Sequence, residues 1–553
     1  MAENYNNNIL NNIPFLNCCY KNTLSAFLIL LVFSCLVFLG GLGKVDLHNS
    51  DEPRVAGIAA EMARSGDLVV PRLNGTPFLE KPPLFFCAES AALKLFGENN
   101  FAARLIPALS ATGCVLILFF LALSMNLSVR GAFLSGFILA TSAEFWNLGR
   151  KNLIDMTLCF FIAASMLFFY KTIHSKSGKI LWYIGFIVSL ACAVLTKGLV
   201  GLAIPLSALF PWLIIKKDFS IGSWSKLCTG AILSIIPVSI WVLLLYKNLG
   251  RDAVYQAVWL NNFGRFTGSY EQHVGPFYYY FASFPVQFLP WSFFLPITGW
   301  LLIRDARKTD KSNPSLFILS WFVIPFILLS ISSGKRGIYL LPLYPAAALA
   351  VGYCADLFLN GKEKSNAWFE IPSSILASIA VITPLVFLGI YLYYHRPFLG
   401  MIFVTIPGFV LGIFSMILLA KKDMGGFYKI LVPSFLVIFL TFGMAITPVL
   451  YKNESLVPLF VYAKNLMSEG AQICLLQPNE RVQGAAVFYL DQRIKKFDNF
   501  DSANEFIQKG NKIMIISEKE NVEKIPDINI IKDFIVGNDT FVIVTDTKMV
   551  KEQ

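Results

Sequence analysis

Two short segments near the start of the chain place acidic and basic residues where a phosphate could bind. The first reads DEPR at 51–54 and the second reads EKPP at 80–83. Glu80 and Lys81 come just before a predicted helix over 84–96, and the backbone N–H groups and dipole at a helix N-terminus favour anions. A phosphate carried on a lipid is therefore an expected ligand. An interfacial helix with solvated charges is the alternative that this loop leaves open.

The first of these segments is predicted to open an amphipathic helix. Pro53 suits the first helical position, which leaves Glu52 as the cap. From Val55 onward, apolar residues recur at i, i+3, i+4 and i+7, and this face can lie on the bilayer. Gly66 is expected to end the helix, and a turn is expected at 74–75.

Further charged residues fall at the ends of predicted membrane spans, all on one side. They are Arg150, Lys151, Asp155, Lys197, Lys335 and Arg336. Ionisable groups at membrane depth are functional hypotheses by default, and a carboxylate among cations suits an acidic lipid headgroup. For any one of them, snorkelling of the side chain into the headgroup region is the alternative explanation.

The composition predicts a polytopic α-helical membrane protein. Of the 553 residues, 56% are apolar and 15% are charged, which argues against a soluble enzyme, a disordered chain or a coiled coil. Thirteen stretches are apolar and long enough to be read as spans. They lie near 23–43, 101–123, 130–147, 153–173, 180–196, 198–215, 227–246, 280–303, 315–333, 337–358, 371–393, 398–420 and 430–450.

Positive charges in the short loops set the predicted orientation. With a cytoplasmic N-terminus, sixteen Lys and Arg lie in short inner loops and six in short outer loops, as the positive-inside rule requires. A transmembrane domain over 1–450 then carries two long outer loops, 44–100 and 247–279. Residues 451–553 form a small outer α/β domain, a lid or scaffold, with strands near 472–477, 512–517 and 541–545 and helices near 456–467 and 501–509.

Several cofactor and partner classes are not supported by the sequence. The net charge of +11 follows from membrane topology and is not gathered into a basic domain, so no nucleic-acid partner is expected. The chain has no phosphate-binding loop, so we expect no nucleotide cofactor. His273 has a carboxylate nearby but no metalloprotease spacing. An activated group used outside the membrane must therefore arrive on a lipid.

Motifs along the membrane part resemble the lipid A aminoarabinose transferase (ArnT) group, which is related to protein O-mannosyltransferases among the GT-C glycosyltransferases. They are DEPR at 51–54, SGDLVVPRLNG at 65–75, EKPPL at 80–84, Asp155, TKG at 196–198, GPFYYY at 275–280 and SGKR at 333–336, with Tyr339, Pro342 and the pair at 344–345. The resemblance implies the same architecture as the span count: about thirteen helices of GT-C type with an outer α/β domain.

The resemblance also implies roles for matching residues. Asp51 and Asp155 would be the catalytic carboxylates. The donor phosphate and substrate would be bound by Arg54, Lys81, Lys197, Arg265, Lys335, Arg336 and Tyr339. Glu80 and His273 would bind a structural divalent metal, with zinc as the expected ion. One position departs from the pattern: residue 78 is Phe where the group is expected to carry Tyr, which leaves headgroup recognition open.

The implied activity is transfer of a sugar, for which the group suggests 4-amino-4-deoxy-L-arabinose, from a polyprenyl-phosphate donor to lipid A or a related outer-leaflet glycolipid. The expected setting is a bacterial inner membrane, with membrane lipids as partners, a periplasmic active site and a monomeric enzyme. A protein O-mannosyltransferase is the nearest alternative. A lipid or solute transporter would place charges near the bilayer midplane, and a scaffold subunit would leave Asp51, Lys81 and Asp155 unexplained.

Overall fold

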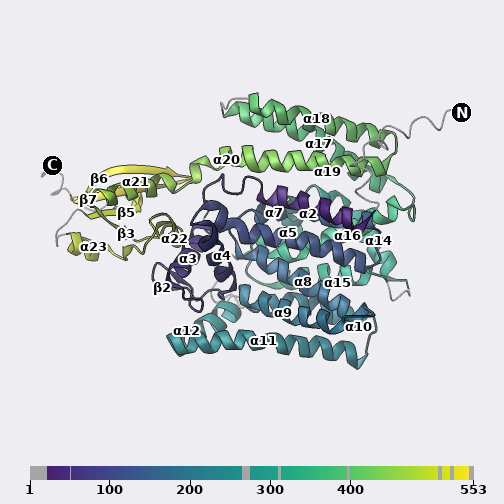
Figure 1. Cartoon of the computed structure of the whole chain (residues 1–553), viewed down its shortest axis with the longest axis horizontal. Helices are drawn as coiled ribbons and strands as arrows, with labels where there is room; N and C mark the ends of the chain where they lie inside the picture. Colours follow the sequence, from purple (N-terminus) through teal and green to yellow (C-terminus); the bar gives the residue numbers. More distant parts are fainter. Residues whose placement is uncertain are drawn as a thin grey trace.

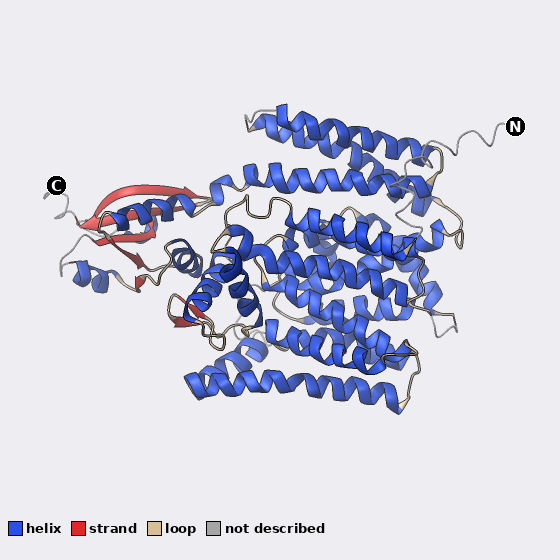
Figure 2. Cartoon of the chain, in the orientation of Figure 1, coloured by secondary structure: helices blue, strands red, loops and turns tan. Residues whose placement is uncertain are grey.

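The computed structural model describes residues 22–49, 51–264, 274–308, 313–394, 399–507, 513–522 and 528–546. A bundle of apolar helices forms the larger part of the molecule, and the strands gather at one end of it (Figures 1 and 2). The bundle elements are α2 (Thr23–Leu39), α5 (Asn100–Ser124), α6 (Val129–Ala140), α7 (Ala143–Gly149), α8 (Ile154–His174), α9 (Lys179–Lys197), α10 (Val200–Ile215), α11 (Ile221–Leu249), α12 (Arg251–Val254), η2 (Tyr255–Gly264), α13 (Tyr279–Gln287), η3 (Trp291–Phe294), α14 (Leu295–Ala306), α15 (Ser315–Ile331), η4 (Gly337–Leu343), α16 (Tyr344–Leu359), α17 (Ala367–Tyr393), α18 (Leu399–Ala420), α19 (Met424–Thr441), η5 (Phe442–Ile446) and α20 (Thr447–Leu450).

The described helices confirm a polytopic α-helical membrane protein. Eight are long and apolar enough to cross a membrane, and α13 with η3 and α14 makes a ninth if that bent pair is one span. The pair bends by 112°, so the single span predicted over 280–303 is broken. Four shorter apolar helices, α2, α6, α10 and α15, lie at other predicted spans. The count of thirteen spans stays a prediction.

Apolar side chains lie both inside the bundle and on its outside. Trp291 and Trp321 are fully buried in the core. By contrast, Ile232 and Leu243 of α11 and Phe403 of α18 are well exposed. Apolar outer faces of this extent suit a lipid environment.

The first long loop folds into α3 (Asp51–Ser65), a short hairpin of β1 (Arg72–Leu73) and β2 (Thr76–Pro77), and α4 (Leu84–Phe96). Gly66 ends α3 with a φ of 72°, which a residue with a side chain rarely adopts, and the turn at 74–75 is confirmed. The cap prediction is wrong: α3 begins at Asp51, and the Asn49 side chain accepts from the N–H groups of Asp51 and Glu52.

The apolar face of α3 is also used differently from the prediction. Val55, Ile58 and Met62 are almost completely buried against a cluster that contains Phe85 and Phe86 of α4. The expectation that this face can lie on the bilayer is therefore wrong, because protein covers it. A helix period predicts that one face is buried but does not say by what.

The C-terminal part is an α/β unit with a five-stranded mixed sheet of order β4-β3-β5-β7-β6. Strands β3, β4 and β5 are parallel, whereas β7 pairs antiparallel with β5 and β6. The three predicted strands and two predicted helices are confirmed. The elements are η6 (Lys452–Glu454), α21 (Val457–Ser468), β3 (Gln472–Leu476), α22 (Glu480–Tyr489), β4 (Lys495–Phe497), α23 (Phe500–Ile507), β5 (Ile513–Glu518), α24 (Lys519–Val522), β6 (Ile528–Val536) and β7 (Asp539–Asp546).

Helix α22 joins this unit to the first loop, and Figure 1 shows α3, α4 and α22 between the sheet and the bundle. A Cβ on Gly484 of α22 would lie 2.4 Å from the carbonyl oxygen of Pro53 and from the Cα of Arg54, and a Cβ on Gly57 would lie 2.5 Å from the carbonyl oxygen of Gly484. The two backbones therefore meet where only glycine fits.

Candidate functional site

The Asp51 carboxylate lies between two arginines from distant parts of the chain. Its Oδ1 accepts from Arg54 Nη2 at 2.5 Å, and its Oδ2 accepts from Arg336 Nη2 at 2.8 Å. Arg54 lies one turn further along α3, so its position follows from helix periodicity. Arg336 immediately precedes η4 and brings in the segment that leads to α16. Asp51 therefore ties the first loop to a loop of the bundle.

A second carboxylate and cation lie close to this pair. Lys197, the last residue of α9, donates to Asp155 Oδ1 in the first turn of α8, and its ammonium nitrogen lies 4.7 Å from the centre of the Tyr339 ring. The charge of Lys197 acts on Asp51, and the charge of Asp155 acts on Arg336. We call Asp51, Arg54, Asp155, Lys197, Arg336 and Tyr339 the Asp51 cluster.

The cations of the cluster keep Asp51 ionised. Burial alone would raise its pKa, but the charges and hydrogen bonds of Arg54, Arg336 and Lys197 outweigh burial and lower the pKa below its ordinary value. Such a carboxylate is a weak base at neutral pH but a strong acceptor for ammonium or hydroxyl donors. The surrounding cations can in turn stabilise negative charge on a bound phosphate.

Three further predicted site residues, Lys335, Glu80 and Lys81, are described by the structure but do not belong to the Asp51 cluster. The ammonium group of Lys335 donates to the carbonyl oxygen of Ser330 at 2.9 Å, at the end of α15, and so points to a helix terminus. Glu80 and Lys81 are half-buried before α4, and Glu80 is one of the charges that raise the pKa of Arg54 against the opposing effect of burial.

The predicted metal pair cannot be assembled from the described residues. His273, one of the two predicted metal ligands, lies outside the part of the chain that the structure describes. The same is true of Arg265, which is predicted to bind the donor phosphate. Within that part, no group of three or more His, Cys, Asp or Glu side chains could hold a metal ion. The metal site therefore stays a prediction.

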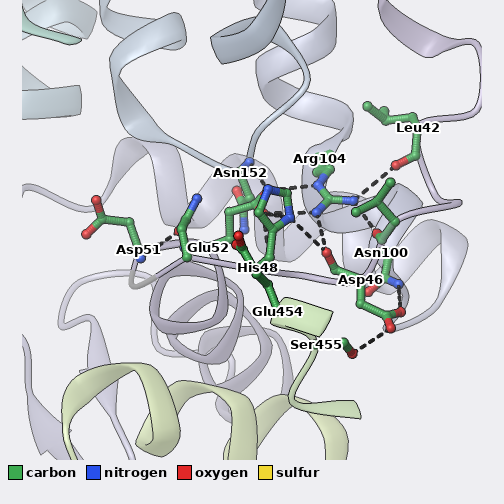
Figure 3. A network of polar contacts seen from close by, with 12 residues as sticks. Leu42, Asp46, His48, Asp51, Glu52, Asn100, Arg104, Asn152, Glu454 and Ser455 are labelled. Atoms are coloured by element: carbon green, nitrogen blue, oxygen red, sulfur yellow. Dashed lines mark hydrogen bonds and ion pairs between the residues drawn. The ribbon is translucent and has the colours of Figure 1, made fainter. Parts of the chain in front are cut away.

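A buried ion pair beside Asp51 escaped the sequence reading. Glu52 Oε1 accepts from Arg104 Nε at 2.7 Å, and Glu52 Oε2 accepts from Arg104 Nη2 at 2.9 Å. The N–H groups of Asn152 and His48 also donate to this carboxylate, at 2.7 and 3.2 Å. Figure 3 shows Asp51 pointing away from this network. The available signal was Arg104 itself, a lone arginine inside an apolar helix that needs a buried partner.

The two buried carboxylates next to Asn152 have opposite pKa shifts. Burial raises the pKa of Glu52, but Arg104 outweighs it and lowers the pKa to about 2. Glu89 accepts from Asn152 Nδ2 at 2.6 Å, and its Oε2 has no partner among the described residues. Burial therefore raises the pKa of Glu89 well above its ordinary value, and Glu52 adds to the effect.

The C-terminal unit also reaches the cluster. Arg54 Nη1 donates to Glu480 Oε2 at 2.6 Å, while its other terminal nitrogen holds Asp51. Glu480 is the first residue of α22, the helix whose Gly484 contacts α3. The Arg54 guanidinium group therefore connects Asp51 of the first loop to Glu480 of the C-terminal unit.

Comparison with known proteins places this arrangement in context. A model of the dolichyl-phosphate-mannose-protein mannosyltransferase family matches residues 24–255. Two similar proteins are undecaprenyl phosphate-alpha-4-amino-4-deoxy-L-arabinose arabinosyl transferases: one from Proteus mirabilis, 30% identical over 64% of each chain, and one from Aeromonas hydrophila, 31% identical over 61% of this chain and 62% of the relative. The chain thus matches less than two thirds of their length.

Solved structures share the fold. ArnT from Cupriavidus metallidurans bound to undecaprenyl phosphate superposes with a TM-score of 0.76 at 19% identity, covering 93% of this chain and 97% of that one. An oligosaccharyltransferase from Archaeoglobus fulgidus gives 0.51 at 11% identity, covering 90% and 69%. The fold is therefore a polytopic helical fold of GT-C type, and the resemblance to the ArnT group is confirmed.

Proposed function

We propose that this chain, an ArnT-like member of the glycosyltransferases related to protein O-mannosyltransferases, moves a sugar from a polyprenyl-phosphate donor to lipid A or a related outer-leaflet glycolipid. The observation that carries the proposal is the Asp51 cluster, which combines two carboxylates with three cations at the end of an apolar bundle. The names of the relatives support undecaprenyl phosphate as the carrier and 4-amino-4-deoxy-L-arabinose as the sugar.

Cations of the cluster would stabilise the leaving group. As the bond from the anomeric carbon to the phosphate oxygen breaks, its electron pair passes to the phosphate and the sugar gains oxocarbenium character. Cations already in place stabilise that developing charge without reorganisation. Arg54, Lys197 and Arg336 suit this task, and Lys81 and Arg265 are proposed to join them.

The state of Asp51 favours a phosphate acceptor. A phosphate monoester is largely ionised at neutral pH because its second pKa is about 6, so it attacks without losing a proton to the enzyme. The ionised Asp51 carboxylate, whose pKa is lowered, would then orient the donor sugar by binding the ammonium group of that sugar. A hydroxyl acceptor would instead require Asp51 to remove a proton, a task for which a lowered pKa is unfavourable.

The remaining proposals concern placement and metal content. Thirteen spans with a cytoplasmic N-terminus would put the cluster and the C-terminal α/β domain in the periplasm of a bacterium, next to outer-leaflet substrates of the inner membrane. We propose a monomer. Glu80 and His273 would hold a structural divalent ion, proposed to be zinc, and no step of the transfer is assigned to it.

A protein O-mannosyltransferase is the second proposed function. It is favoured by the match of the mannosyltransferase family model to residues 24–255, which include both Asp51 and Asp155. In that case the acceptor is a Ser or Thr hydroxyl, and Asp51 is the general base.

Reconstitution with defined substrates separates these functions. The purified chain in liposomes is given a polyprenyl-phosphate sugar labelled in the sugar, together with lipid A or a Ser/Thr-rich peptide, and Asp51→Asn is the control. Label on lipid A that depends on Asp51 supports the first proposal, and label on the peptide supports the second. Donor binding or movement across the bilayer without transfer to either acceptor contradicts both and indicates a transporter.

A further inference from the structure

A basic hollow lies beside the Glu52–Arg104 pair. It is bordered by the segment after α2, by α7 and the turn that follows it, and by α20, and no residue of the Asp51 cluster lines it. The space inside it that the centre of a water molecule can occupy has a volume of about 40 Å³. By that measure one water needs about 10–15 Å³, so the hollow accommodates about three waters, the scale of a small tetrahedral anion. The polar and aromatic lining residues that matter here are His48, Arg104, Trp146, Arg150, Lys151 and Tyr451.

Arg150 is a cation without a carboxylate partner among the described residues. Its Nη1 donates to the carbonyl oxygens of Val37 and Phe38, at 3.0 and 3.1 Å, and its guanidinium lies 5.1 Å from the centre of the Trp146 ring. Burial, and then the charge of Arg104, lower the pKa of Arg150 to about 10. A half-buried cation without a carboxylate partner gains stability from a bound anion.

Lys151 adds a second positive charge to the hollow. Its ammonium group lies 5.9 Å from the centre of the Tyr451 ring. The charge of Lys151 interacts with the Glu144 carboxylate. The Oε2 atom of Glu144 also accepts a hydrogen bond from Asn147 Nδ2 at 3.0 Å. Glu52 neutralises Arg104 and Glu144 offsets part of the charge of Lys151, so Arg150 and the rest of the Lys151 charge leave the hollow net positive.

His48 supplies an unused acceptor in the same hollow. Its Nδ1 lies 3.1 Å from the carbonyl oxygen of Asp46, and its ring stacks on Tyr451 with centres 4.2 Å apart. Its Nε2 is buried and has no partner among the described residues. With the Nδ1 proton donated to Asp46, a neutral His48 presents a lone pair at Nε2. Burial lowers the pKa of His48, Arg104 and Lys151 act in the same direction, and Glu52 opposes them.

These groups together match one ligand chemistry. We propose that the hollow binds inorganic phosphate, or a phosphate monoester in its singly ionised form, whose ionised oxygens face Arg150 and Lys151 and whose remaining P–OH donates to His48 Nε2. Sulfate carries the same shape and charge but has no proton to donate near neutral pH, and a phosphodiester has no P–OH. The site is independent of the proposed transferase activity, because none of its residues belongs to the Asp51 cluster.

Anion binding to the full-length chain in detergent tests the proposal. Calorimetric titration with inorganic phosphate is compared with titration with sulfate at equal ionic strength. We expect phosphate to bind at least about tenfold more tightly, a difference of about 1.4 kcal/mol. Lys151→Met should weaken phosphate binding by about tenfold, and His48→Gln should remove the preference for phosphate over sulfate.

A lysine at another ring provides the matched control. Lys171 lies 4.5 Å from the centre of the Trp182 ring, in the last turn of α8, and Lys171→Met should leave phosphate affinity unchanged. Arg150→Met is informative only if it folds, because Arg150 also caps α2, so Lys151 and His48 carry the test. Equal affinity for phosphate and sulfate, or unchanged affinity in both Lys151→Met and His48→Gln, would overturn the proposal.

The source of the phosphate is resolved by a competition arm. The chain is reconstituted in phosphatidylcholine bilayers with or without phosphatidic acid, which carries a phosphate monoester. Weakened binding of inorganic phosphate in the presence of phosphatidic acid, absent when phosphatidylglycerol replaces it, identifies a lipid headgroup as the occupant. Unchanged binding identifies soluble phosphate.

Discussion

Asp51 and Glu52 are neighbours in sequence and lie in opposite environments. The Asp51 side chain is 12% exposed and shared by two arginines, one of which also binds Glu480. Glu52 is fully buried and is closed in by Arg104 and two backbone N–H groups. The first carboxylate keeps a small exposed surface, and its partners are ones that a charged substrate could replace, whereas the second carboxylate is fully enclosed. The comparison separates a carboxylate available for chemistry from one that holds the fold.

Asp51→Asn should produce the largest effect on activity. The amide keeps the shape of the side chain but removes the charge that would orient the donor or accept a proton, so transfer should fall by about 10²–10⁴-fold. The melting temperature should remain near that of the wild type, because only the partially open pair is altered. Turnover of labelled donor measures the effect. Near-normal turnover would remove Asp51 from the mechanism.

Glu52→Gln should lower the stability of the protein, whereas Asp51→Asn should lower activity in a protein that still folds. Removing one partner of a buried ion pair destabilises a protein by about 3–5 kcal/mol, because the other charge stays buried. Denaturant or thermal unfolding in detergent measures the loss. The double variant Glu52→Leu with Arg104→Met should recover part of it. A Glu52→Gln protein as stable as the wild type would show that Arg104 finds another partner.

The contrast between these neighbours also marks how far sequence reasoning reaches. The family resemblance of the DEPR motif singled out Asp51 and Arg54, and the structure brings their side chains into contact within one helical turn of α3. Local rules for helix ends wrongly predicted Glu52 as a helix cap. Nothing in the neighbouring sequence indicates that Glu52 is buried against Arg104, which lies 52 residues later. Contacts between distant segments depend on packing, and Glu480 meets Arg54 across 426 residues for the same reason. Apolar runs predicted the bundle well, because helices in lipid must satisfy their own backbone.

Glu480→Ala tests whether the C-terminal unit positions the cluster. Arg54 would lose one of its two carboxylates, so its hold on Asp51 should become less defined, and kcat should fall by about tenfold, or about 1.4 kcal/mol. KM for the donor should change less. Lys464→Met, which breaks the exposed ion pair with Asp491 in the same unit, is the matched control and should keep wild-type kcat. Equal losses in both variants would indicate general destabilisation.

Acid should weaken the fold through Glu52. Its pKa is lowered from an ordinary 4.5 to about 2 in the folded state, so its stabilisation is present above the unfolded pKa and disappears as pH falls from about 4.5 toward about 2. The shift corresponds to roughly 3 kcal/mol. Unfolding curves for the wild type and Glu52→Gln should therefore converge as pH falls through this window. A constant difference between them would contradict the assignment.

Glu89→Gln should give the smallest effect and the opposite sign. Because burial raises the pKa of Glu89 in the folded state, its neutral form contributes stability below the unfolded pKa, and that contribution fades as pH rises through the folded pKa. A glutamine is neutral at every pH and can still accept from Asn152, so the variant should equal or exceed wild-type stability by up to about 1 kcal/mol near neutral pH. Near pH 4 any advantage should vanish. Unfolding in detergent across pH measures the difference, and a loss of stability near neutral pH would mean that Glu89 is ionised and paired, as Glu52 is.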